Sequence, residues 1–153
     1  MGRLKKLYKT KSATETKKVA KMLAEIVQQR PSQKHATVVL LKGDLGAGKT
    51  TFIQGVLRGL GVKKKIVSPT FTLVRSYVLK TGVFTKAYHF DCYRIADETE
   101  VQALGFTDLL KDPHNILFIE WPEHIRKILP RKVGTVTFSY GKTLNERTIE
   151  IQV

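Results

Sequence analysis

The chain has 153 residues, of which 27 are lysine or arginine and 13 are aspartate or glutamate, so its formal net charge is +14. A chain of this length buries roughly two-thirds of its unfolded surface, which is sufficient for one domain with its own core. The single cysteine, Cys92, excludes an internal disulfide framework and the usual four-ligand zinc sites. These features predict one domain over residues 1–153 and a reducing compartment.

The positive charge is concentrated near the N-terminus. Residues 1–35 hold ten basic and two acidic side chains. A charge excess of this kind suits a polyanionic partner such as RNA. It fits equally well a basic, solvated surface that has no dedicated partner, so charge alone leaves both alternatives open.

The apolar runs of the chain are short. Two of the longest, Thr37–Leu41 and Ile116–Ile119, fall far below the roughly 18 residues that a membrane-spanning helix needs. The basic N-terminal residues precede a helix-capping pattern, not an apolar stretch with a cleavage site. We therefore expect a cytoplasmic protein with no membrane contact.

The first predicted elements are a short strand and a helix. Residues 1–11 are expected to form either a short edge strand or a flexible basic arm. The capping-box spacing of Ser12-Ala13-Thr14-Glu15 predicts a helix start, and Pro31 is expected to end that helix. Apolar residues then recur at helical spacing and form one buried stripe, which comprises Val19, Met22, Leu23, Ile26 and Val27.

A buried strand followed by a glycine-rich loop forms the centre of the predicted fold. The continuous apolar run Thr37–Leu41 is typical of a strand that is covered on both faces. A helix over residues 49–58 follows the loop. The β-rich segments Phe71–Val78 and Val83–Phe90 are separated by a turn, and they predict an antiparallel hairpin beside the central strand.

The second half of the chain continues the alternation of helices and strands. The pattern predicts a short helix that starts at Asp97–Glu100 and ends at Gly105. A buried strand over residues 116–119 and a short helix over residues 121–128 are expected to follow. A closing hairpin is predicted over residues 134–140 and 148–153. Together these elements predict an α/β, three-layer P-loop NTPase-like fold whose central sheet is mixed and partly antiparallel. No segment is long enough to be a linker between domains.

The glycine-rich loop carries the strongest functional signal. Gly43-Asp44-Leu45-Gly46-Ala47-Gly48-Lys49-Thr50 fits the pattern G-x-x-x-x-G-K-[ST], and it lies between a predicted strand and a predicted helix. Glycines allow backbone N–H groups to approach a phosphate chain closely, and Lys49 supplies positive charge to it. The Thr50 hydroxyl is placed to bind Mg²⁺. We therefore predict a site for ATP or ADP with Mg²⁺ over residues 43–51.

Two acidic residues follow predicted strands and are candidates for the metal site. Asp91 comes directly after a strand that ends at His89-Phe90, and Glu120 follows the buried strand Ile116–Ile119. Ligands of α/β proteins bind at the carboxyl ends of strands, so we expect Thr50, Glu120 and Asp91 to hold the metal. The alternative is that each acid caps the next element at the surface.

Several further motifs resemble one particular family. Besides the P-loop and Thr51, the chain contains the motifs Ser68-Pro69-Thr70-Phe71, His89-Phe90-Asp91-Cys92-Tyr93-Arg94, Leu104-Gly105-Phe106 and Ile119-Glu120-Trp121-Pro122-Glu123. In content and order these motifs resemble those of the TsaE family, formerly called YjeE. The resemblance covers residues 12–151. It implies a small bacterial ATPase required for N6-threonylcarbamoyladenosine at position 37 of tRNAs that read ANN codons. It also implies action with TsaD, which transfers the threonylcarbamoyl group, and with TsaB, so that contact with tRNA runs through the complex.

The resemblance also assigns roles to individual residues. It implies that Lys49, Thr70, Asp91 and Glu120 are catalytic. It also implies that residues 68–71 form a switch-like segment in which Thr70 senses the γ-phosphate. Trp121 is expected near the nucleotide, either against the base or as an anchor of its own loop. Other positions keep two interpretations. Hydroxyls of Ser12–Thr16 either approach adenine or only cap the helix, and Arg94 either bridges to phosphate or forms a structural salt bridge. His89 and Tyr93 are packing or orienting residues, and Cys92 is a small buried side chain.

Two other functions remain open at this stage. A P-loop with a strand-end acid is also compatible with a small-molecule kinase, although a chain of this length has little room for a lid and an acceptor domain. A basic RNA-binding module with secondary nucleotide binding is the other alternative, because the lysine run at residues 63–65 exceeds what the motifs require.

Overall fold

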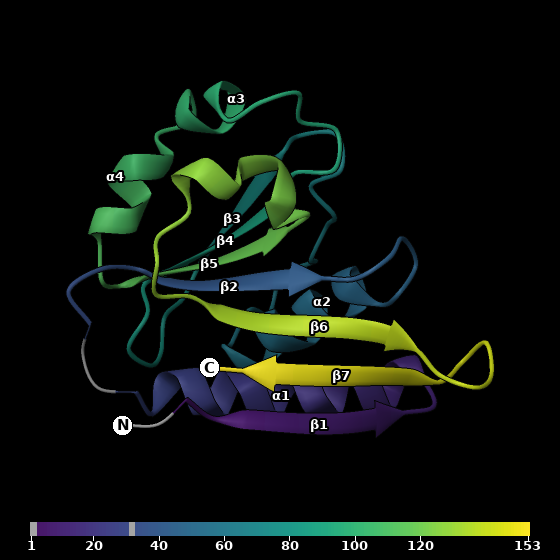
Figure 1. The fold of residues 1–153 in the computed structure, drawn as a ribbon. Coiled ribbons are helices and arrows are strands. Elements are labelled where there is room, and N and C mark those ends of the chain that lie inside the picture. Colours follow the sequence, from purple (N-terminus) through teal and green to yellow (C-terminus); the bar gives the residue numbers. More distant parts are fainter. Residues whose placement is uncertain (1–2, 31–32) are drawn as a thin grey trace.

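The structure is a computed structural model that describes residues 3–30 and 33–153. Its centre is a seven-stranded mixed sheet of order β1-β7-β6-β2-β5-β4-β3 within the described residues (Figure 1). Four neighbouring strands, β6, β2, β5 and β4, run parallel, and β1, β7 and β3 pair antiparallel at the two sides. The strands span Lys5–Thr10 (β1), Thr37–Lys42 (β2), Val74–Val78 (β3), Lys86–Asp91 (β4), Asn115–Glu120 (β5), Gly134–Tyr140 (β6) and Arg147–Gln152 (β7).

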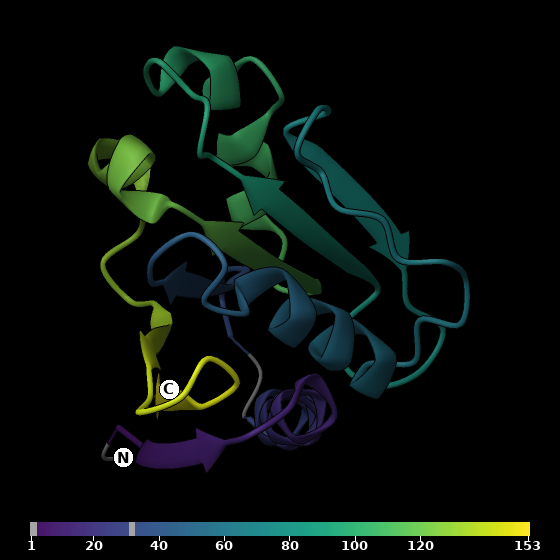
Figure 2. The ribbon, with the colours of Figure 1, turned by 90° about the vertical axis from the view of Figure 1, so that its right-hand side faces the viewer.

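Helices cover both faces of the sheet and complete a three-layer arrangement. One face is covered by α1 (Ala13–Gln28) and α2 (Lys49–Gly59), which pack against each other (Figures 1 and 2). The other face is covered by α3 (Thr99–Gln102), α4 (Phe106–Lys111) and the 3₁₀ helix η1 (Pro122–Ile128). The predicted α/β class and mixed sheet are therefore confirmed.

The central strand β2 is buried on both faces, as its continuous apolar sequence predicts. Val39 and Leu41 belong to the core under α1 and α2, whereas Val38 and Leu40 belong to the core under α4 and η1. Side chains of a strand alternate between faces, so a strand with helices on both sides needs apolar residues at every position.

The first helix begins at the predicted capping box. The Ser12 hydroxyl accepts a hydrogen bond from the Glu15 backbone N–H, and the Glu15 carboxylate accepts one from the backbone N–H of Lys11. The helix ends at Gln28, and Pro31, which was expected to end it, lies outside the described residues. Of the two alternatives for the N-terminal segment, the structure shows the edge strand, β1.

The structure differs from the predictions in several places. The strand predicted from Val83 begins only at Lys86, and β5 lies between the hairpin β3–β4 and the central strand β2, which that hairpin was expected to adjoin. The strand predicted from Phe71 begins only at Val74, because the backbone N–H groups of Thr72 and Leu73 both bond back to the Pro69 carbonyl in a turn. The helix expected to end at Gly105 is a single turn, and a second helix, α4, starts after it. Gly105 adopts a φ of +80° and is the N-cap of that helix, so the glycine connects two helices where the sequence indicated only an end.

Among the helices that the structure describes, none combines the length and apolar character that a membrane-spanning segment requires.

Candidate functional site

The predicted phosphate loop connects the carboxyl end of β2 to the N-terminus of α2, at one end of the parallel strands (Figure 1). Gly48, the residue before the helix, has a φ of +102°, and no atom lies within 4 Å of the position that a Cβ would take. Glycine is therefore required there by the backbone conformation and not by crowding. The first backbone N–H groups of α2 point out of the helix toward this loop.

A cavity of about 420 Å³ opens beside the loop and brings most of the predicted site residues together. It is lined by Leu45, Gly46, Gly48, Lys49, Thr50, Thr51, Thr70, Asp91, Tyr93, Arg94, Glu120 and Trp121. Three residues of the predicted loop do not line it, namely Gly43, Asp44 and the buried Ala47. The cavity is thus formed by the loop, the first turn of α2, the ends of β4 and β5, and the switch-like segment.

Lys49 is buried with only 5% of its surface exposed, although it carries a charge. Its Nζ donates hydrogen bonds to the carbonyl oxygens of Gly43 and, at 2.9 Å, Asp44. The same Nζ lies 4.4 Å from the centre of the Trp121 ring. Burial lowers the pKa of Lys49, while Glu120 and Asp44 act in the opposite direction. The loop carbonyls therefore hold the ammonium group at the cavity wall.

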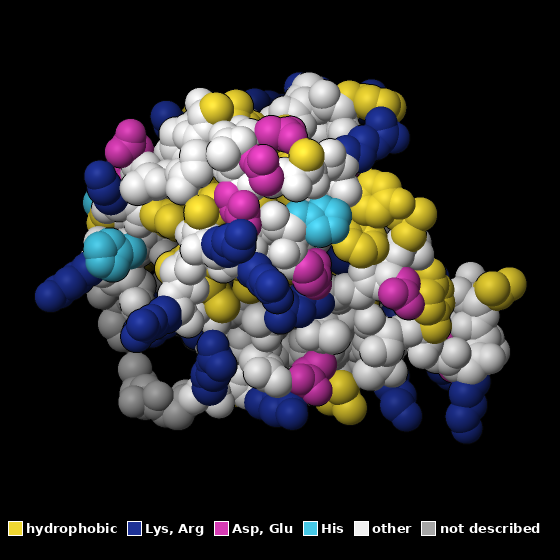
Figure 3. Space-filling view, turned by 45° about the horizontal axis from the view of Figure 1, so that its top comes forward, with side chains coloured by type: hydrophobic (Ala, Val, Ile, Leu, Met, Phe, Trp, Pro, Cys, Tyr) yellow, Lys and Arg dark blue, Asp and Glu magenta, His cyan; other side chains and the backbone are white. Residues whose placement is uncertain are grey.

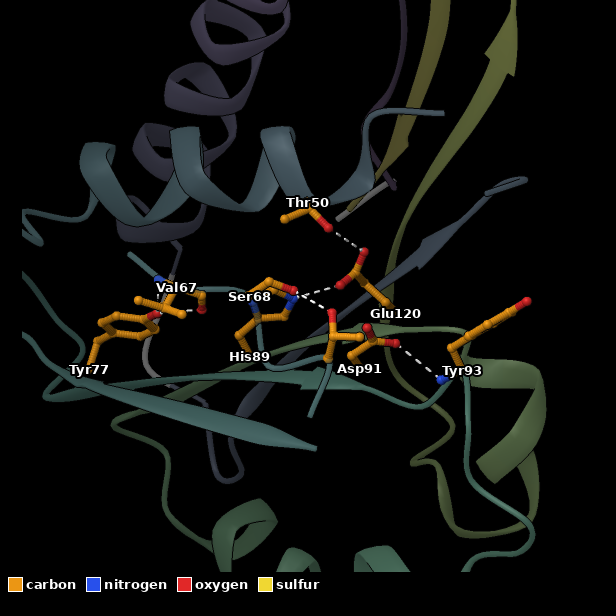
Figure 4. A network of polar contacts seen from close by, with 9 residues as sticks. Thr50, Val67, Ser68, Tyr77, His89, Asp91, Tyr93 and Glu120 are labelled. Carbon is orange, nitrogen blue, oxygen red and sulfur yellow. Dashed lines mark hydrogen bonds and ion pairs between the residues drawn. The ribbon is translucent and has the colours of Figure 1, made fainter. Parts of the chain in front are cut away.

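Glu120, the last residue of β5, is 3% exposed and joins two elements (Figure 4). Its Oε1 accepts a hydrogen bond from the Thr50 hydroxyl at 3.2 Å. Its Oε2 lies 2.8 Å from Nε2 of His89, which is itself buried on β4. Of the two interpretations of His89, the structure supports the orienting one, because the imidazole fixes the direction of this carboxylate.

Asp91 ends β4 at the position that pairs with Glu120 in the parallel register. The two acids therefore stand side by side at the strand ends, as the strand-end argument predicts. Asp91 Oδ1 accepts a hydrogen bond from the Tyr93 backbone N–H at 3.1 Å. With the Thr50 hydroxyl they form a set of hard oxygen donors, which is the chemistry that Mg²⁺ prefers.

The protein alone supplies few ligands for such an ion. The described residues contain no group of three or more His, Cys, Asp or Glu side chains that could hold a metal. A Mg²⁺ ion typically keeps several waters and binds through one or two carboxylates plus substrate phosphates. The residues present fit a metal that arrives with a nucleotide better than one held by the protein alone.

The switch-like segment forms another wall of the cavity. Thr70 lines the cavity, and its hydroxyl lies 2.7 Å from that of Ser68. The Tyr77 hydroxyl on β3 bonds to both the N–H and the carbonyl of Val67, each at 3.2 Å (Figure 4). The base of the segment is therefore anchored to the sheet, while Phe71 at its tip is 87% exposed.

Arg94 lines the cavity and stacks on the switch-like segment. Its guanidinium carbon lies 5.4 Å from the centre of the Phe71 ring. Within the described residues Arg94 forms no ion pair, so the structure does not support the structural salt bridge, which was one of the two interpretations of this residue. Its guanidinium is left for the cavity and the aromatic ring.

Trp121 adopts a left-handed backbone conformation with a φ of +57°, an uncommon one for a bulky residue, at the start of η1. Its ring lies 4.9 Å from that of Tyr93 and covers Lys49, so it stands at the phosphate-loop end of the cavity. A second cavity, of about 210 Å³, lies on the other side of the loop. It is lined by Ser12, Ala13, Thr16, Gly46, Gly48, Thr51, Asn145 and Arg147.

Some residues of this region were missed from the sequence. Asn145 and Arg147 come from the β6–β7 hairpin and reach the loop only through the antiparallel pairing of these strands. No local motif marks them. Cys92 is fully buried, and burial raises the pKa of its thiol to about 12, which agrees with a packing role.

These features define the P-loop NTPase fold. A glycine loop joins a buried parallel strand to a helix that starts with a lysine and a threonine, and acids stand at the ends of the neighbouring strands. Within that class the chain belongs to the TsaE family. The sequence model of the family "Threonylcarbamoyl adenosine biosynthesis protein TsaE" matches residues 10–149. This family is involved in tRNA threonylcarbamoyladenosine biosynthesis.

Individual relatives agree with this assignment. The chain is 41% identical over 120 residues to a tRNA threonylcarbamoyladenosine biosynthesis protein TsaE of Haemophilus influenzae, a match that covers 78% of this chain and 73% of that protein. The protein of the same name from Rickettsia felis is 44% identical over 116 residues, 75% of this chain and 61% of its own length. The crystal structure of YdiB from Bacillus subtilis superposes with a TM-score of 0.68 at 29% identity, covering all of this chain and 88% of that one.

Proposed function

We propose that this protein binds ATP with Mg²⁺ at the phosphate loop and hydrolyses it in support of N6-threonylcarbamoyladenosine formation at position 37 of tRNAs that read ANN codons. The observation that carries the proposal is the shared cavity. It places Lys49 and Thr50 of the loop opposite Asp91 and Glu120 at the ends of neighbouring strands. Membership of the TsaE family supplies the pathway.

The residues divide the work of phosphoryl transfer between them. The backbone N–H groups of the loop and the Lys49 ammonium bind the phosphate chain and offset its negative charge. Thr50, Glu120 and Asp91 would hold Mg²⁺, which supplies further charge neutralisation at the phosphates when bound. Asp91 orients the attacking water, and Thr70 reports the presence of the γ-phosphate.

Catalysis of this kind rests on positioning and charge and needs little covalent chemistry from the protein. Glu120 is well suited to positioning, because both of its oxygens are already held by neighbouring side chains. Arg94 lines the cavity with its guanidinium stacked on Phe71, and the sequence carries no motif that marks an arginine finger. We therefore expect slow hydrolysis that a partner accelerates.

We further propose that the partners are TsaD and TsaB and that tRNA is reached through that complex. Three exposed apolar side chains lie at or beside the cavity. Leu45 (68% exposed) and Tyr93 (45%) line it, and Phe71 (87%) stacks on Arg94 of its wall. Figure 3 shows hydrophobic side chains along this side of the molecule. A surface of this character beside a nucleotide site suits a protein partner whose docking depends on the nucleotide.

The test is a measurement of ATP binding and phosphate release with and without TsaB and TsaD. Wild-type protein is expected to bind ATP and release inorganic phosphate faster with the partners, and Lys49→Ala and Glu120→Ala are expected to lose this activity. Thr50→Ser, which keeps the hydroxyl, serves as the matched control for Thr50→Val. Unchanged binding, hydrolysis and tRNA modification in Lys49→Ala or Glu120→Ala would refute the proposal. ATP labelled at the γ-position tests the kinase alternative, since a kinase transfers the label to an acceptor.

A further inference from the structure

The last residue of β6 and the first residue of β7, Tyr140 and Arg147, contact the phosphate loop. In the sheet they lie on the side of β2 opposite to β5 and β4. The phosphate loop and the loop between β6 and β7 lie at the same end of the sheet (Figure 1). The Tyr140 hydroxyl donates a hydrogen bond to the Leu45 carbonyl at 2.7 Å, and Nη2 of Arg147 donates one to the Gly46 carbonyl at 3.4 Å. The Arg147 guanidinium carbon also lies 4.5 Å from the centre of the Tyr140 ring. Two consecutive carbonyl groups of the phosphate loop are thus held by one stacked pair of side chains.

These contacts determine which way the loop's N–H groups point. In a trans peptide the carbonyl and the following N–H point in opposite directions. Holding the Leu45 carbonyl toward Tyr140 therefore directs the Gly46 N–H away from the hairpin. This N–H has no acceptor within the described part of the chain. Gly46 lines both cavities beside the loop, so the group is available to an anion there.

The next peptide group is fixed in the same way. The Gly46 carbonyl bonds to Arg147, and the Ala47 N–H on the other side of that peptide donates to the Asp44 carbonyl at 3.1 Å. Gly46 has a φ of +77°, and a Cβ at this residue would lie 3.3 Å from the Tyr140 hydroxyl. Glycine at this position therefore serves both the backbone conformation and the close approach of the tyrosine.

Arg147 also orders the hairpin loop from which it acts. It donates hydrogen bonds to the carbonyl oxygens of Leu144 and, at 2.9 Å, Glu146. The Gly141 N–H bonds to the Glu146 carbonyl at 2.8 Å and closes the loop. One guanidinium with several fixed donors therefore ties the hairpin loop and the phosphate loop into a single unit.

We propose that Tyr140 and Arg147 are positioning residues of the phosphate loop. They hold the Leu45–Gly46 peptide group so that its N–H is free to bind a phosphate chain, and they fix the Gly46–Ala47 peptide group beside it, while Lys49 holds the carbonyls of Gly43 and Asp44. A loop ordered before the ligand arrives loses less conformational freedom on binding, so affinity rises without a new ligand contact. This inference rests on the proposed function, because it assumes that the loop binds nucleotide phosphates.

The experiment compares Tyr140→Phe, which removes only the hydroxyl, with Arg147→Lys, which keeps the charge and loses the planar fork. Lys142→Ala removes a positive charge from the same hairpin and is the matched control. Dissociation constants for ATP and for inorganic tripolyphosphate are measured by fluorescence of Trp121, which is the only tryptophan of the chain. Thermal unfolding is followed in parallel.

We expect Tyr140→Phe and Arg147→Lys each to weaken ATP and tripolyphosphate binding by the same factor, about fivefold for the loss of one hydrogen bond. For Tyr140→Phe the midpoint of thermal unfolding is expected to stay within about 2 °C, because Tyr140 is half exposed. Lys142→Ala should bind as the wild type does.

Equal affinities for the wild type and both variants would overturn the inference. So would weaker ATP binding with unchanged tripolyphosphate binding, because Arg147 would then act on the nucleoside and not on the loop. Lower unfolding midpoints with unchanged affinity would show a merely structural role. A wild-type protein that binds neither probe would instead refute the proposed function.

Discussion

His89 and Glu120 form a buried pair in which the imidazole Nε2 and the carboxylate Oε2 lie 2.8 Å apart, on the adjacent strands β4 and β5. Their side chains are 1% and 4% exposed. The other oxygen of Glu120 accepts a hydrogen bond from the Thr50 hydroxyl, so this carboxylate connects the sheet to the first turn of α2. The stability of the protein and the geometry of its candidate site therefore depend on the same contact.

We predict that His89→Phe lowers the free energy of unfolding by about 2 kcal/mol, because it leaves a buried carboxylate oxygen without its partner. Urea denaturation measures this change. The double variant with Glu120→Gln is expected to be more stable than the sum of the two single changes implies, since the partners act as a unit. Strictly additive effects of the two substitutions would contradict the coupling.

We predict a pH-dependent effect of Lys49. Burial lowers the pKa of this group below its ordinary value of 10.5. In the window between the lowered pKa and 10.5, the unfolded chain binds a proton that the folded chain does not, so this residue makes stability rise with pH. Below that window the buried charge is present and its unfavourable effect on folding is complete.

The corresponding measurement is the unfolding free energy of the wild type and of Lys49→Met between pH 7 and the alkaline end of the folded range. The difference is expected to shift in favour of the wild type as pH rises. Lys63→Met, at an exposed position, corrects for the general loss of one positive charge. Parallel curves for the wild type and Lys49→Met would disprove the prediction.

We predict that Phe71→Ala weakens docking on TsaB and TsaD while leaving stability nearly unchanged. The ring is 87% exposed, so its removal should alter the unfolding free energy by no more than about 0.5 kcal/mol. Pull-down with the two partners in the presence of ATP measures docking. Leu144→Ala is the control, because Leu144 is 88% exposed but lies on the β6–β7 hairpin loop. If Phe71→Ala and Leu144→Ala lost docking equally, the effect would come from exposed apolar surface in general, and the prediction for Phe71 would be wrong.

A further prediction concerns the unpaired positive charge. Of the 27 lysines and arginines, only Lys5 and Lys111 lie within 4.0 Å of a carboxylate among the described residues. If the excess cations contact tRNA directly, binding falls steeply with salt, and neutralising Lys63, Lys64 and Lys65 reduces the salt slope. Gel-shift titrations at several salt concentrations measure this. The proposed function expects weak binding of tRNA to the isolated protein, whereas tight binding that persists in Lys49→Ala would favour the RNA-binding alternative.

Much of the site was accessible from the sequence, because its parts are local. The loop from Gly43 to Thr50 is a contiguous pattern, and its position between an apolar run and a helix follows from hydrophobic periodicity. Asp91 and Glu120 were placed together by one rule, namely that the carboxyl ends of parallel strands share an edge of the sheet, and the register confirms their adjacency. The TsaE motifs were confirmed by the family match over residues 10–149.

Other features were not accessible, because they depend on which strands become neighbours. His89 and Glu120 are 31 positions apart, and Tyr140 and Leu45 are 95 positions apart. A shift of one residue in the pairing of a strand turns every side chain to the opposite face, so such contacts are fixed by register and not by local pattern.

The sequence by itself determined the family of this protein and the residues of its candidate site, since the phosphate loop, the strand-end acids and the family motifs are encoded in short contiguous segments. Only the tertiary structure decided how those residues are held. It placed His89 against Glu120, it placed the β6–β7 hairpin against the loop, and it stacked Arg94 on Phe71 with no ion pair among the residues that the structure describes. The physical reason is that backbone conformation and hydrogen bonding within a loop are local, whereas the orientation of a buried carboxylate or of a loop carbonyl depends on the packing of distant strands.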